Sequence, residues 1–442
     1  MEFKENFALL NVSVVTGKGD APHPDMAVVV KDGVIREVRK MKDYKKEQGV
    51  QEVSLEGHYV MPGLIDAHVH LSGVRAGMDD GVTGGLAEPK LLRAMRSVYE
   101  AQAILKRGFT SVRDISLNGL YIKRLFYGNR IPGPKVVAAG MGLSRTGGHG
   151  DLYQYTNEYV DENGFWAILA DGKDEVVKGV RWLLREGADQ IKFWACGGDH
   201  WANDRAIDVH YSMEEMKAIV EEAHRQKGTK VLCHAETRES IAMALEAGVD
   251  TIEHGEDLTE ELAERMVREN KILCPTLQLI VNWYRDFVKS DDAEEVMHRP
   301  HVFLYRELYT HNIDMEKAVV EARQRSIDSF KLALAKGVKV ALGSDTVFEP
   351  LTPYGEYSAL EFKAMIEFGM TVGQAITAAT KNGAEALGME HVLGTVEPGK
   401  LADLLVVRKD PTADENVLYD PSNIFLTFCD GRLTVEDGRF AY

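Results

Sequence analysis

Hydrophobic and polar residues follow two different periods in different parts of the chain. Residues 7–61 contain short Val-rich runs broken by Gly, Asp and Pro, and the segment 402–440 has the same texture with two Asp-Gly turns. Both segments predict short β-strands. Between them, from about residue 63 to residue 388, short apolar runs alternate with amphipathic stretches such as 174–187, whose apolar residues recur at helical spacing. The chain is therefore expected to have a mixed α/β middle flanked by two β-rich ends.

The middle of the chain predicts a parallel sheet, because strand-like runs alternate with helical stretches. The runs are LIDAHVHL, FTSVRD, KVVAAGM, QIKFWA, KVLCHA, TIEHG, ILCPT and KVALGSD. Eight such runs match the strands of a (β/α)8 TIM barrel better than an open, doubly wound sheet. We predict an α/β protein with a TIM-barrel domain at residues 62–389. Both chain ends, residues 1–61 plus 390–442, are expected to form one small β-sandwich domain.

Two stretches, residues 142–173 and 276–335, are too long for simple connections between strands and helices. Long insertions at one face of a barrel are usually binding loops or lids. The first stretch is rich in aromatic residues and is a candidate apolar lid, although an ordinary packed loop explains it nearly as well. Its aromatic residues include Tyr153, Tyr155, Tyr159, Phe165 and Trp166.

Composition and charge exclude several classes of protein. Charged residues make up 27% and hydrophobic residues 45%, as in ordinary globular proteins. The net charge of −17, with no basic run, argues against nucleic acid and anionic membranes as partners. No apolar run approaches membrane-spanning length, and the first residues lack the pattern of a signal peptide. None of the 4 cysteines forms a CxxC motif. We expect a cytoplasmic protein.

Residues of the types that bind metals fall at the carboxyl ends of five predicted strands. His68 and His70 end the first run, and residues i and i+2 of a strand share a face, so both imidazoles can reach one metal ion, as suits Zn²⁺. Barrel active sites are built at this end of the strands. The other candidates end the fourth, fifth, sixth and eighth runs: Lys192, His234, His254 and Asp345.

Each candidate has an ordinary structural explanation when taken alone. An HxH pair is common in strands, Lys192 could extend its charge to solvent, and Asp345 could cap a helix. The six together would require independent coincidences at five strand ends, so we interpret them as one metal site. His149, in the motif GGHGD after the third run, is a further candidate because the glycines beside it let the backbone approach a ligand closely.

These motifs resemble the amidohydrolase superfamily. The resemblance rests on PGLIDAHVHL, IEHG, GSD and GTVEPGKLADLLVV and covers the chain from about Ala8 to its end. Within the superfamily, GFTSVRD, TGGHGD and IKFWACGG are similar to the group that contains prolidases (Xaa-Pro dipeptidases), other dipeptidases and ochratoxinase-like amidases. The resemblance implies a metal-dependent hydrolase that cleaves amide-type C–N bonds of a small molecule such as a dipeptide or N-acyl amino acid. It also implies a homo-oligomer.

The resemblance gives each candidate a role. Lys192 would carry a CO2-derived carbamate that bridges two divalent metal ions. Burial of the lysine favours carbamate formation, because burial lowers the pKa of the amine and the neutral amine takes up CO2. Zn²⁺ is the expected metal, and Mn²⁺, Fe²⁺ or Co²⁺ would also suit the ligands. A metal-bridging hydroxide would attack the carbonyl while Asp345 shuttles a proton to the leaving nitrogen. The first ion would be held by His68, His70 and Asp345, and the second by His234 and His254.

Three residues are candidates for contacts with the substrate, and a fourth is a candidate for supporting the site. By resemblance, His149 would touch the substrate carbonyl or carboxylate. Glu236 stands where dipeptidase-like relatives often have a tyrosine or histidine that meets a substrate carboxylate, so its charge favours a neutral or cationic substrate instead. Tyr354 lies where relatives often carry a His-Gly pair and is a candidate substrate contact. Glu361, on the following helix, is expected to support the site from behind.

Three alternative functions are open. The first is a urea or carbamate hydrolase with the same mechanism. The second is a mononuclear deaminase or an imidazolonepropionase-like ring hydrolase, although deaminases tend to show HxxE where this chain has His234-Ala235-Glu236, and Lys192 favours two metals. The third is a non-catalytic scaffold, which would usually have lost one or more of the six ligands.

Overall fold

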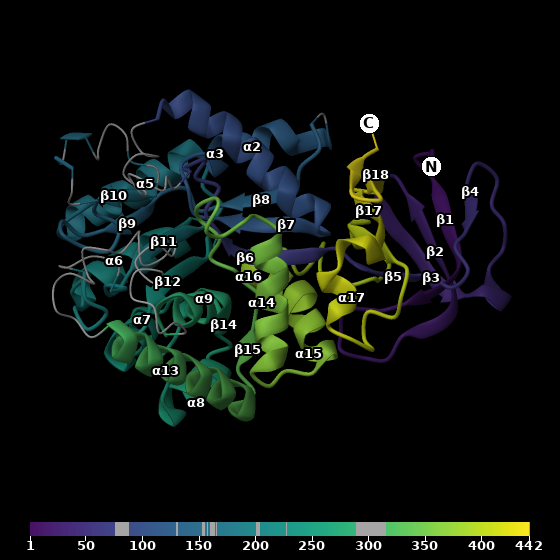
Figure 1. Ribbon diagram of the computed structural model, residues 1–442. Coiled ribbons are helices and arrows are strands. Elements are labelled where there is room, and N and C mark those ends of the chain that lie inside the picture. Colours follow the sequence, from purple (N-terminus) through teal and green to yellow (C-terminus); the bar gives the residue numbers. More distant parts are fainter. Residues whose placement is uncertain are drawn as a thin grey trace.

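The computed structural model describes residues 1–75, 88–129, 131–152, 155–156, 158–159, 164, 166–199, 204–226, 228–288 and 315–441. A large part of alternating strands and helices lies beside a β-rich part that contains both chain ends (Figure 1). Of the predicted lid aromatics, Tyr153 and Phe165 lie outside the described residues. None of the helices within the described residues is long and apolar enough to cross a bilayer.

All eight predicted runs of the middle part contain a strand, and their neighbours run parallel. One sheet has the order β6-β7-β8 and the other the order β10-β9-β11-β12-β13-β14-β15. The short strands β9 and β10 lie inside the segment 142–173, which was predicted to be a loop. The strands are β6 (Leu64–Val69), β7 (Phe109–Asp114), β8 (Lys135–Ala138), β9 (Gly142–Ser144), β10 (Ala167–Leu169), β11 (Ile191–Trp194), β12 (Val231–Ala235), β13 (Thr251–His254), β14 (Ile272–Cys274) and β15 (Lys339–Val340).

Backbone hydrogen bonds connect the two parallel sheets at both of their edges. On one side, the amide of Ala67 in β6 donates to the carbonyl of Leu342, just after β15, at 2.7 Å. On the other side, the amide of Asp189 donates to the carbonyl of Ala138 in β8, also at 2.7 Å. The carboxyl ends of β6, β11, β12, β13 and β15 therefore face a common region.

Helices cover the outside of these strands (Figure 1). Their apolar faces pack on the sheet, as in α5, where Val176, Val180 and Leu183 are all fully buried. Side-chain caps fix several N-termini; in α6, Ser212 and Glu215 form a reciprocal capping box. The helices are α2 (Lys90–Lys106), α3 (Gly119–Phe126), α5 (Lys173–Glu186), α6 (Met213–Arg225), α7 (Arg238–Ala247), α8 (Glu260–Arg268), α9 (Leu277–Val288), α13 (Met315–Lys336), α14 (Glu356–Glu367), α15 (Val372–Thr377), α16 (Gly383–Leu387) and α17 (Asn416–Tyr419).

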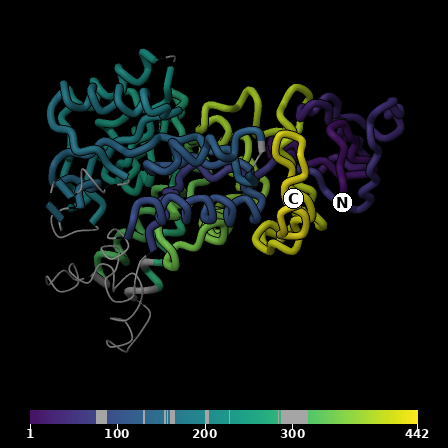
Figure 2. The backbone as a smooth tube through the Cα atoms, turned by 90° about the horizontal axis from the view of Figure 1, so that it is seen from above, coloured from purple at the N-terminus to yellow at the C-terminus, as the bar shows by residue number. Residues whose placement is uncertain are grey.

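The two chain ends share one mixed β-sheet. Its order is β19-β18-β17-β16-β5-β1-β2-β3, with β4 also paired to β1. The sheet curls, because the rings of Phe7 in β1 and Phe428 in β17 stack at 5.1 Å although two strands separate them in the order. Figure 2 shows the C-terminal segment in yellow beside the purple N-terminal strands. The strands are β1 (Phe7–Val14), β2 (His23–Lys31), β3 (Val34–Lys40), β4 (Gln51–Ser54), β5 (Tyr59–Pro62), β16 (Leu404–Val407), β17 (Ile424–Cys429), β18 (Arg432–Glu436) and β19 (Arg439–Phe440).

Candidate metal centre and active site

One pocket at the carboxyl ends of the parallel strands collects most of the predicted site residues. It holds roughly 690 Å³ of space, including the part open to solvent. The pocket contains all six predicted metal ligands together with His149 and Glu236, but not Tyr354. The side chains that line it are His68, His70, His149, Trp166, Lys192, Trp194, His234, Glu236, His254, Leu279, Asp345, Val347 and Phe348.

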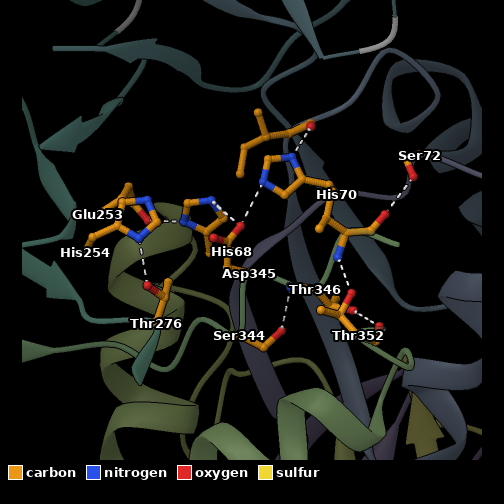
Figure 3. A network of polar contacts seen from close by, with 12 residues as sticks. His68, His70, Ser72, Glu253, His254, Thr276, Ser344, Asp345, Thr346 and Thr352 are labelled. Carbon is orange, nitrogen blue, oxygen red and sulfur yellow. Dashed lines mark hydrogen bonds and ion pairs between the residues drawn. The ribbon is translucent and has the colours of Figure 1, made fainter. Parts of the chain in front are cut away.

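His68 and His70 direct their Nε2 atoms at the same carboxylate oxygen (Figure 3). Oδ1 of Asp345 lies 3.4 Å from Nε2 of His68 and 3.0 Å from Nε2 of His70. Burial alone would raise the pKa of Asp345, but His68, His70 and His254 outweigh it and hold the pKa below its ordinary value. Burial and the nearby charge of Lys192 lower the pKa of His68 to about 4. The carboxylate is thus ionised beside the His68 imidazole, which favours the neutral form.

The other ring nitrogens of these two histidines are already engaged. Nδ1 of His70 lies 2.8 Å from the carbonyl oxygen of Ile115, and a carbonyl can only accept, so this nitrogen carries the hydrogen. Nδ1 of His68 lies 2.7 Å from Oε2 of Glu253. Because Arg113 and His68 hold the pKa of Glu253 below its ordinary value despite burial, that carboxylate is also an acceptor. In the neutral tautomers that these contacts select, both Nε2 atoms carry lone pairs.

This arrangement fits a bound cation. The Nε2 lone pairs of His68 and His70 and the Oδ1 of Asp345 are three acceptor atoms that face one another, and their ligand atoms lie within 4.8 Å of each other. Acceptors at this separation repel one another unless a positive charge lies between them. Two imidazoles and a carboxylate, each imidazole oriented through its second nitrogen, are a donor set that divalent transition metals prefer.

His234 and His254 form a second pair beside the first. Their ring centroids are 4.5 Å apart, and the ring of His254 lies 5.5 Å from that of His68. Nδ1 of His254 lies 2.7 Å from the hydroxyl of Thr276, and Nε2 of His234 lies 3.1 Å from the carbonyl of Gly197. Each ring thus has one nitrogen held by the protein and the other available, and burial lowers the pKa of both imidazoles.

Lys192 lines the same pocket as the two pairs of histidines. The residue is 1% exposed, and its Nζ lies 5.7 Å from the centre of the Trp194 ring. Burial lowers the pKa of Lys192, and the nearby carboxylates of Glu253 and Asp345 offset this only in part. Within the described part of the chain, the amine forms no ion pair. A buried amine with a lowered pKa has the nucleophilic neutral form that carbamate formation requires.

The strand ends that carry these ligands turn sharply. His254 has φ 70°, Asp345 has φ 55° and Thr276 has φ 48°, all in the left-handed region that residues other than glycine rarely adopt. The turn at His254 lets it face the same region as its neighbour Glu253, although consecutive residues of a strand point to opposite faces. Backbone strain of about 1–3 kcal/mol per residue is characteristic of functional sites.

His149 is held against the site by an acidic partner that sequence reasoning missed. Its Nδ1 lies 2.6 Å from Oδ2 of Asp204, which is buried, and its ring stacks on that of His234 at 4.6 Å. Gly198 packs directly against the imidazole; an added Cβ would lie 2.5 Å from Cε1 of His149. The His149 ring is therefore fixed in place as part of the pocket wall.

Glu236 lies between this pocket and an adjoining one. The second pocket is lined by Asp199, Glu236 and Glu256 together with Arg325. Burial raises the pKa of Glu236 well above its ordinary value, and the negative charges of Glu256 and Asp199 raise it further. Three carboxyl groups with raised pKa against one guanidinium leave this region without surplus positive charge, which disfavours an anionic group of a substrate.

The structure does not bring Tyr354 and Glu361 to the pocket. Tyr354 is 4% exposed, and its hydroxyl lies 2.6 Å from the carbonyl of His70 and 2.8 Å from that of Val347, so it supports the backbone beneath a ligand. Glu361 accepts hydrogen bonds from the amides of Leu277 at 3.0 Å and Gln278 at 2.6 Å, which lie at the N-terminus of α9. It thus supports the site through that helix, which carries the pocket residue Leu279.

Two further acidic residues that hold the ligands were not selected from the sequence. Glu253 precedes His254 and contacts His68. Asp66 precedes His68 by two residues, and its carboxylate accepts from the amides of His68 at 3.1 Å and Ser344 at 3.0 Å. The only signal in the sequence was their position: Asp66 and His68 share a strand face, and Glu253 lies next to a candidate ligand.

Comparison with known proteins agrees with this geometry. Residues 59–434 match the model of the Amidohydrolase family. Ochratoxinase of Aspergillus niger is 29% identical over 441 residues, covering 95% of this chain and 85% of that protein. Its crystal structure superposes with a TM-score of 0.84 at 27% identity, covering 98% of this chain and 96% of that one.

Two other relatives extend the comparison. A prolidase complexed with N-methylphosphonate-L-proline has a TM-score of 0.83 and 28% identity, covering 98% of this chain and 100% of that one. Imidazolonepropionase of Porphyromonas gingivalis is 26% identical over 456 residues, covering 94% of this chain and 89% of that protein. The predicted identity as a hydrolytic enzyme that acts on C–N bonds is confirmed. The chain belongs to the amidohydrolase family.

Proposed function

We propose that this enzyme is a binuclear metal-dependent hydrolase that cleaves the amide bond of a dipeptide, an N-acyl amino acid or a related small amide. The observation that carries the proposal is the convergence of His68 and His70, each through Nε2, on Oδ1 of Asp345. The second pair of histidines and the buried Lys192 beside it support a second cation. Two divalent cations, with Zn²⁺ first among the candidates, supply Lewis acidity toward the scissile carbonyl and lower the pKa of water.

We also propose the architecture in which this site is built. The parallel strands, joined by backbone hydrogen bonds at both sheet edges, support a closed (β/α)8 barrel at residues 62–389. The curled sheet of the two chain ends supports a β-sandwich of residues 1–61 and 390–442. Active sites of such barrels lie at the carboxyl ends of the strands, where the pocket is found.

The proposed ligand set divides between two cations. His68, His70 and Asp345 would hold the first, and His234 and His254 would hold the second. Lys192, as a carbamate formed with CO2, would supply anionic oxygen ligands. Burial supports this modification, because it lowers the pKa of the amine, and a carbamate anion balances part of the charge of two cations in a buried site.

The residues of this chain then divide the catalytic work. Asp345 uses Oδ1 toward His68 and His70, which leaves Oδ2 to take a proton from the attacking water and to deliver it to the leaving nitrogen. This protonation is needed because an amine is a poor leaving group when unprotonated. His149, fixed by Asp204, lies in the pocket wall where it can orient the substrate carbonyl.

The charge around Glu236 bears on the choice of substrate. Its carboxyl group, with Asp199 and Glu256 close by, favours substrates that present at this side of the pocket a neutral hydrogen-bonding group, or a cation that would ionise it. Ureas and carbamates, which share the carbonyl–nitrogen bond but carry no carboxylate, are the second candidate class. The relatives named ochratoxinase and prolidase support amide chemistry rather than deamination.

Metal content per chain tests the proposal first. Elemental analysis of protein purified without chelators should give two equivalents, and Lys192→Met should lower this number. In protein supplied with ¹³C-bicarbonate, a carbamate ¹³C signal should be present and should disappear in Lys192→Met. The matched control is Lys135→Met, because Lys135 is also largely buried but is ion-paired with Asp403, which raises its pKa and leaves no neutral amine.

Turnover is then measured on dipeptides, N-acyl amino acids, aryl amides and ureas. Asp345→Asn should keep bound metal and lose about 10²–10⁴-fold in kcat, as expected for a lost acid–base group. Near-normal turnover of that variant would eliminate Asp345 as the proton carrier. One metal equivalent that does not depend on Lys192 would instead favour a mononuclear deaminase or ring hydrolase, and no metal after reconstitution would leave a non-catalytic scaffold.

A further inference from the structure

A buried ion pair lies among the parallel strands beneath the metal ligands. Arg113 of β7 and Glu253 of β13 are both completely buried, and Nη2 of Arg113 lies 2.7 Å from Oε1 of Glu253. The guanidinium also donates to the carbonyl of Ala67 at 2.6 Å and to the hydroxyl of Thr251 at 3.1 Å. Branched apolar residues usually fill the interior between such strands, so this pair is an exception that calls for a reason.

A contribution to folding stability does not explain why the ion pair of Arg113 and Glu253 is there. Desolvation of two charges offsets most of their attraction, and replacing a buried ion pair by apolar residues is often neutral or stabilising. The other contact of the pair is more informative. The second carboxylate oxygen of Glu253, Oε2, accepts a hydrogen bond from Nδ1 of His68 at 2.7 Å (Figure 3). The ion pair therefore extends to a predicted metal ligand.

The consequence for His68 is a fixed tautomer and a fixed ring orientation. With the hydrogen on Nδ1, the lone pair is on Nε2, which faces Asp345 at 3.4 Å. His70 is held in the same way by the backbone carbonyl of Ile115. Of these two histidines, only His68 has its Nδ1 held by a side chain, so a substitution can remove that hydrogen bond. A carboxylate partner also makes the ligating imidazole more basic than a carbonyl does.

We propose that Arg113 and Glu253 are positioning residues that set the affinity of the cation site formed by His68, His70 and Asp345. Arg113 binds Oε1 of Glu253, which leaves Oε2 to hold the Nδ1 hydrogen of His68. Since Arg113 balances the charge of Glu253, the pair supports the ligand without adding net charge next to the cation. This inference rests on the metal centre proposed above.

Two double variants separate the parts of this support. Arg113→Met with Glu253→Leu removes the acceptor and leaves no unpaired buried charge. Arg113→Met with Glu253→Gln removes the charge but keeps an amide oxygen for Nδ1 of His68. The control pair is Lys135→Met with Asp403→Asn, which removes a buried ion pair of similar length, 2.7 Å, that contacts none of the predicted ligands in the described chain.

The measurement is the affinity of each metal-free protein for Zn²⁺, by competition with a chelator, and the visible absorption spectrum of the Co²⁺-loaded protein. We expect the Leu variant to bind one equivalent about 10–100-fold more weakly, the range seen when such an outer partner is lost. The Gln variant should recover part of the affinity and of the spectrum. The control pair should change the thermal unfolding midpoint but neither of these readouts.

The outcomes are distinguishable from a failure of the proposed function. If the wild-type chain binds two equivalents and both double variants bind them with unchanged affinity, the pair is structural and this inference is overturned. If the Leu variant does not fold, the Gln variant still tests the charged pair, and wild-type affinity in it overturns the role of Arg113 and of the charge on Glu253. If the wild-type chain binds no metal at all, the proposed metal centre fails and the inference falls with it.

Discussion

Gly343, two residues before Asp345, is predicted to be intolerant of even one added methyl group. It lies after β15 at a buried position where three elements of the site meet. A Cβ built there would lie 2.1 Å from Sγ of Cys274 and 2.8 Å from Cβ of His68. Both separations are far inside the ~3.5–4.0 Å optimum for nonbonded atoms. Gly343→Ala must therefore displace Cys274 of β14, the proposed metal ligand His68, or both.

The size of the effect follows from these contacts. Overpacking of a well-packed core typically costs about 1–3 kcal/mol, and here the closest obstacle is a single sulfur atom on a short side chain. Cys274→Ala alone, which deletes one buried atom, should cost about 1 kcal/mol. In the double variant the 2.1 Å contact disappears while the 2.8 Å contact to His68 stays. The two substitutions should therefore be coupled, with the double variant more stable than their sum by about 1 kcal/mol or more.

The assay is urea-induced unfolding of the four metal-free proteins of this cycle, followed by tryptophan fluorescence and far-UV circular dichroism. Gly373→Ala in α15 is the matched control, because its nearest atom outside the helix is 3.6 Å from the added Cβ. A helical Gly→Ala change with room for the methyl should stabilise by about 0.5–1 kcal/mol. The reasoning is refuted if Gly343→Ala is as stable as the wild type, or if the cycle is additive.

Two more predictions concern residues beneath and beside the pocket. Tyr354→Phe should lower stability by about 1–3 kcal/mol, because it removes the hydrogen bond to the buried carbonyls of His70 and Val347. The variant should leave KM unchanged. A large rise in KM would mean that the hydroxyl contacts the substrate after all. Burial lowers the pKa of His210 to about 3 from its ordinary 6.5. Between these two values the unfolded chain binds a proton that the folded chain does not. The free energy of unfolding therefore decreases as pH falls from about 6.5 toward 3. His210→Asn should make the slope of unfolding free energy against pH shallower in that window, by up to about 1.4 kcal/mol per pH unit, and an equal slope in both proteins would contradict this.

Local pattern was enough to predict the strands and the positions of the candidate ligands. The eight apolar runs contain strands in the structure, as predicted. Short apolar runs that alternate with amphipathic stretches have few arrangements that bury the apolar residues of both, and a parallel sheet covered by helices is one of them. His68 and His70 face one pocket because residues two apart on a strand share a face. The family was also legible, since its motifs lie at these strand ends. These features depend on neighbours in sequence, which a single chain displays directly.

Hydrogen-bond partners were decided by the tertiary structure. Tyr354 and Glu361 were associated with the site by their place in the sequence, yet one binds a backbone carbonyl and the other the start of a helix. Glu253 reaches His68 across 185 positions of the chain, and Asp204 reaches His149 across 55. A period along a strand tells which face a side chain takes, but not which residue of another strand stands opposite. That pairing follows from sheet order and register, which only the folded chain defines.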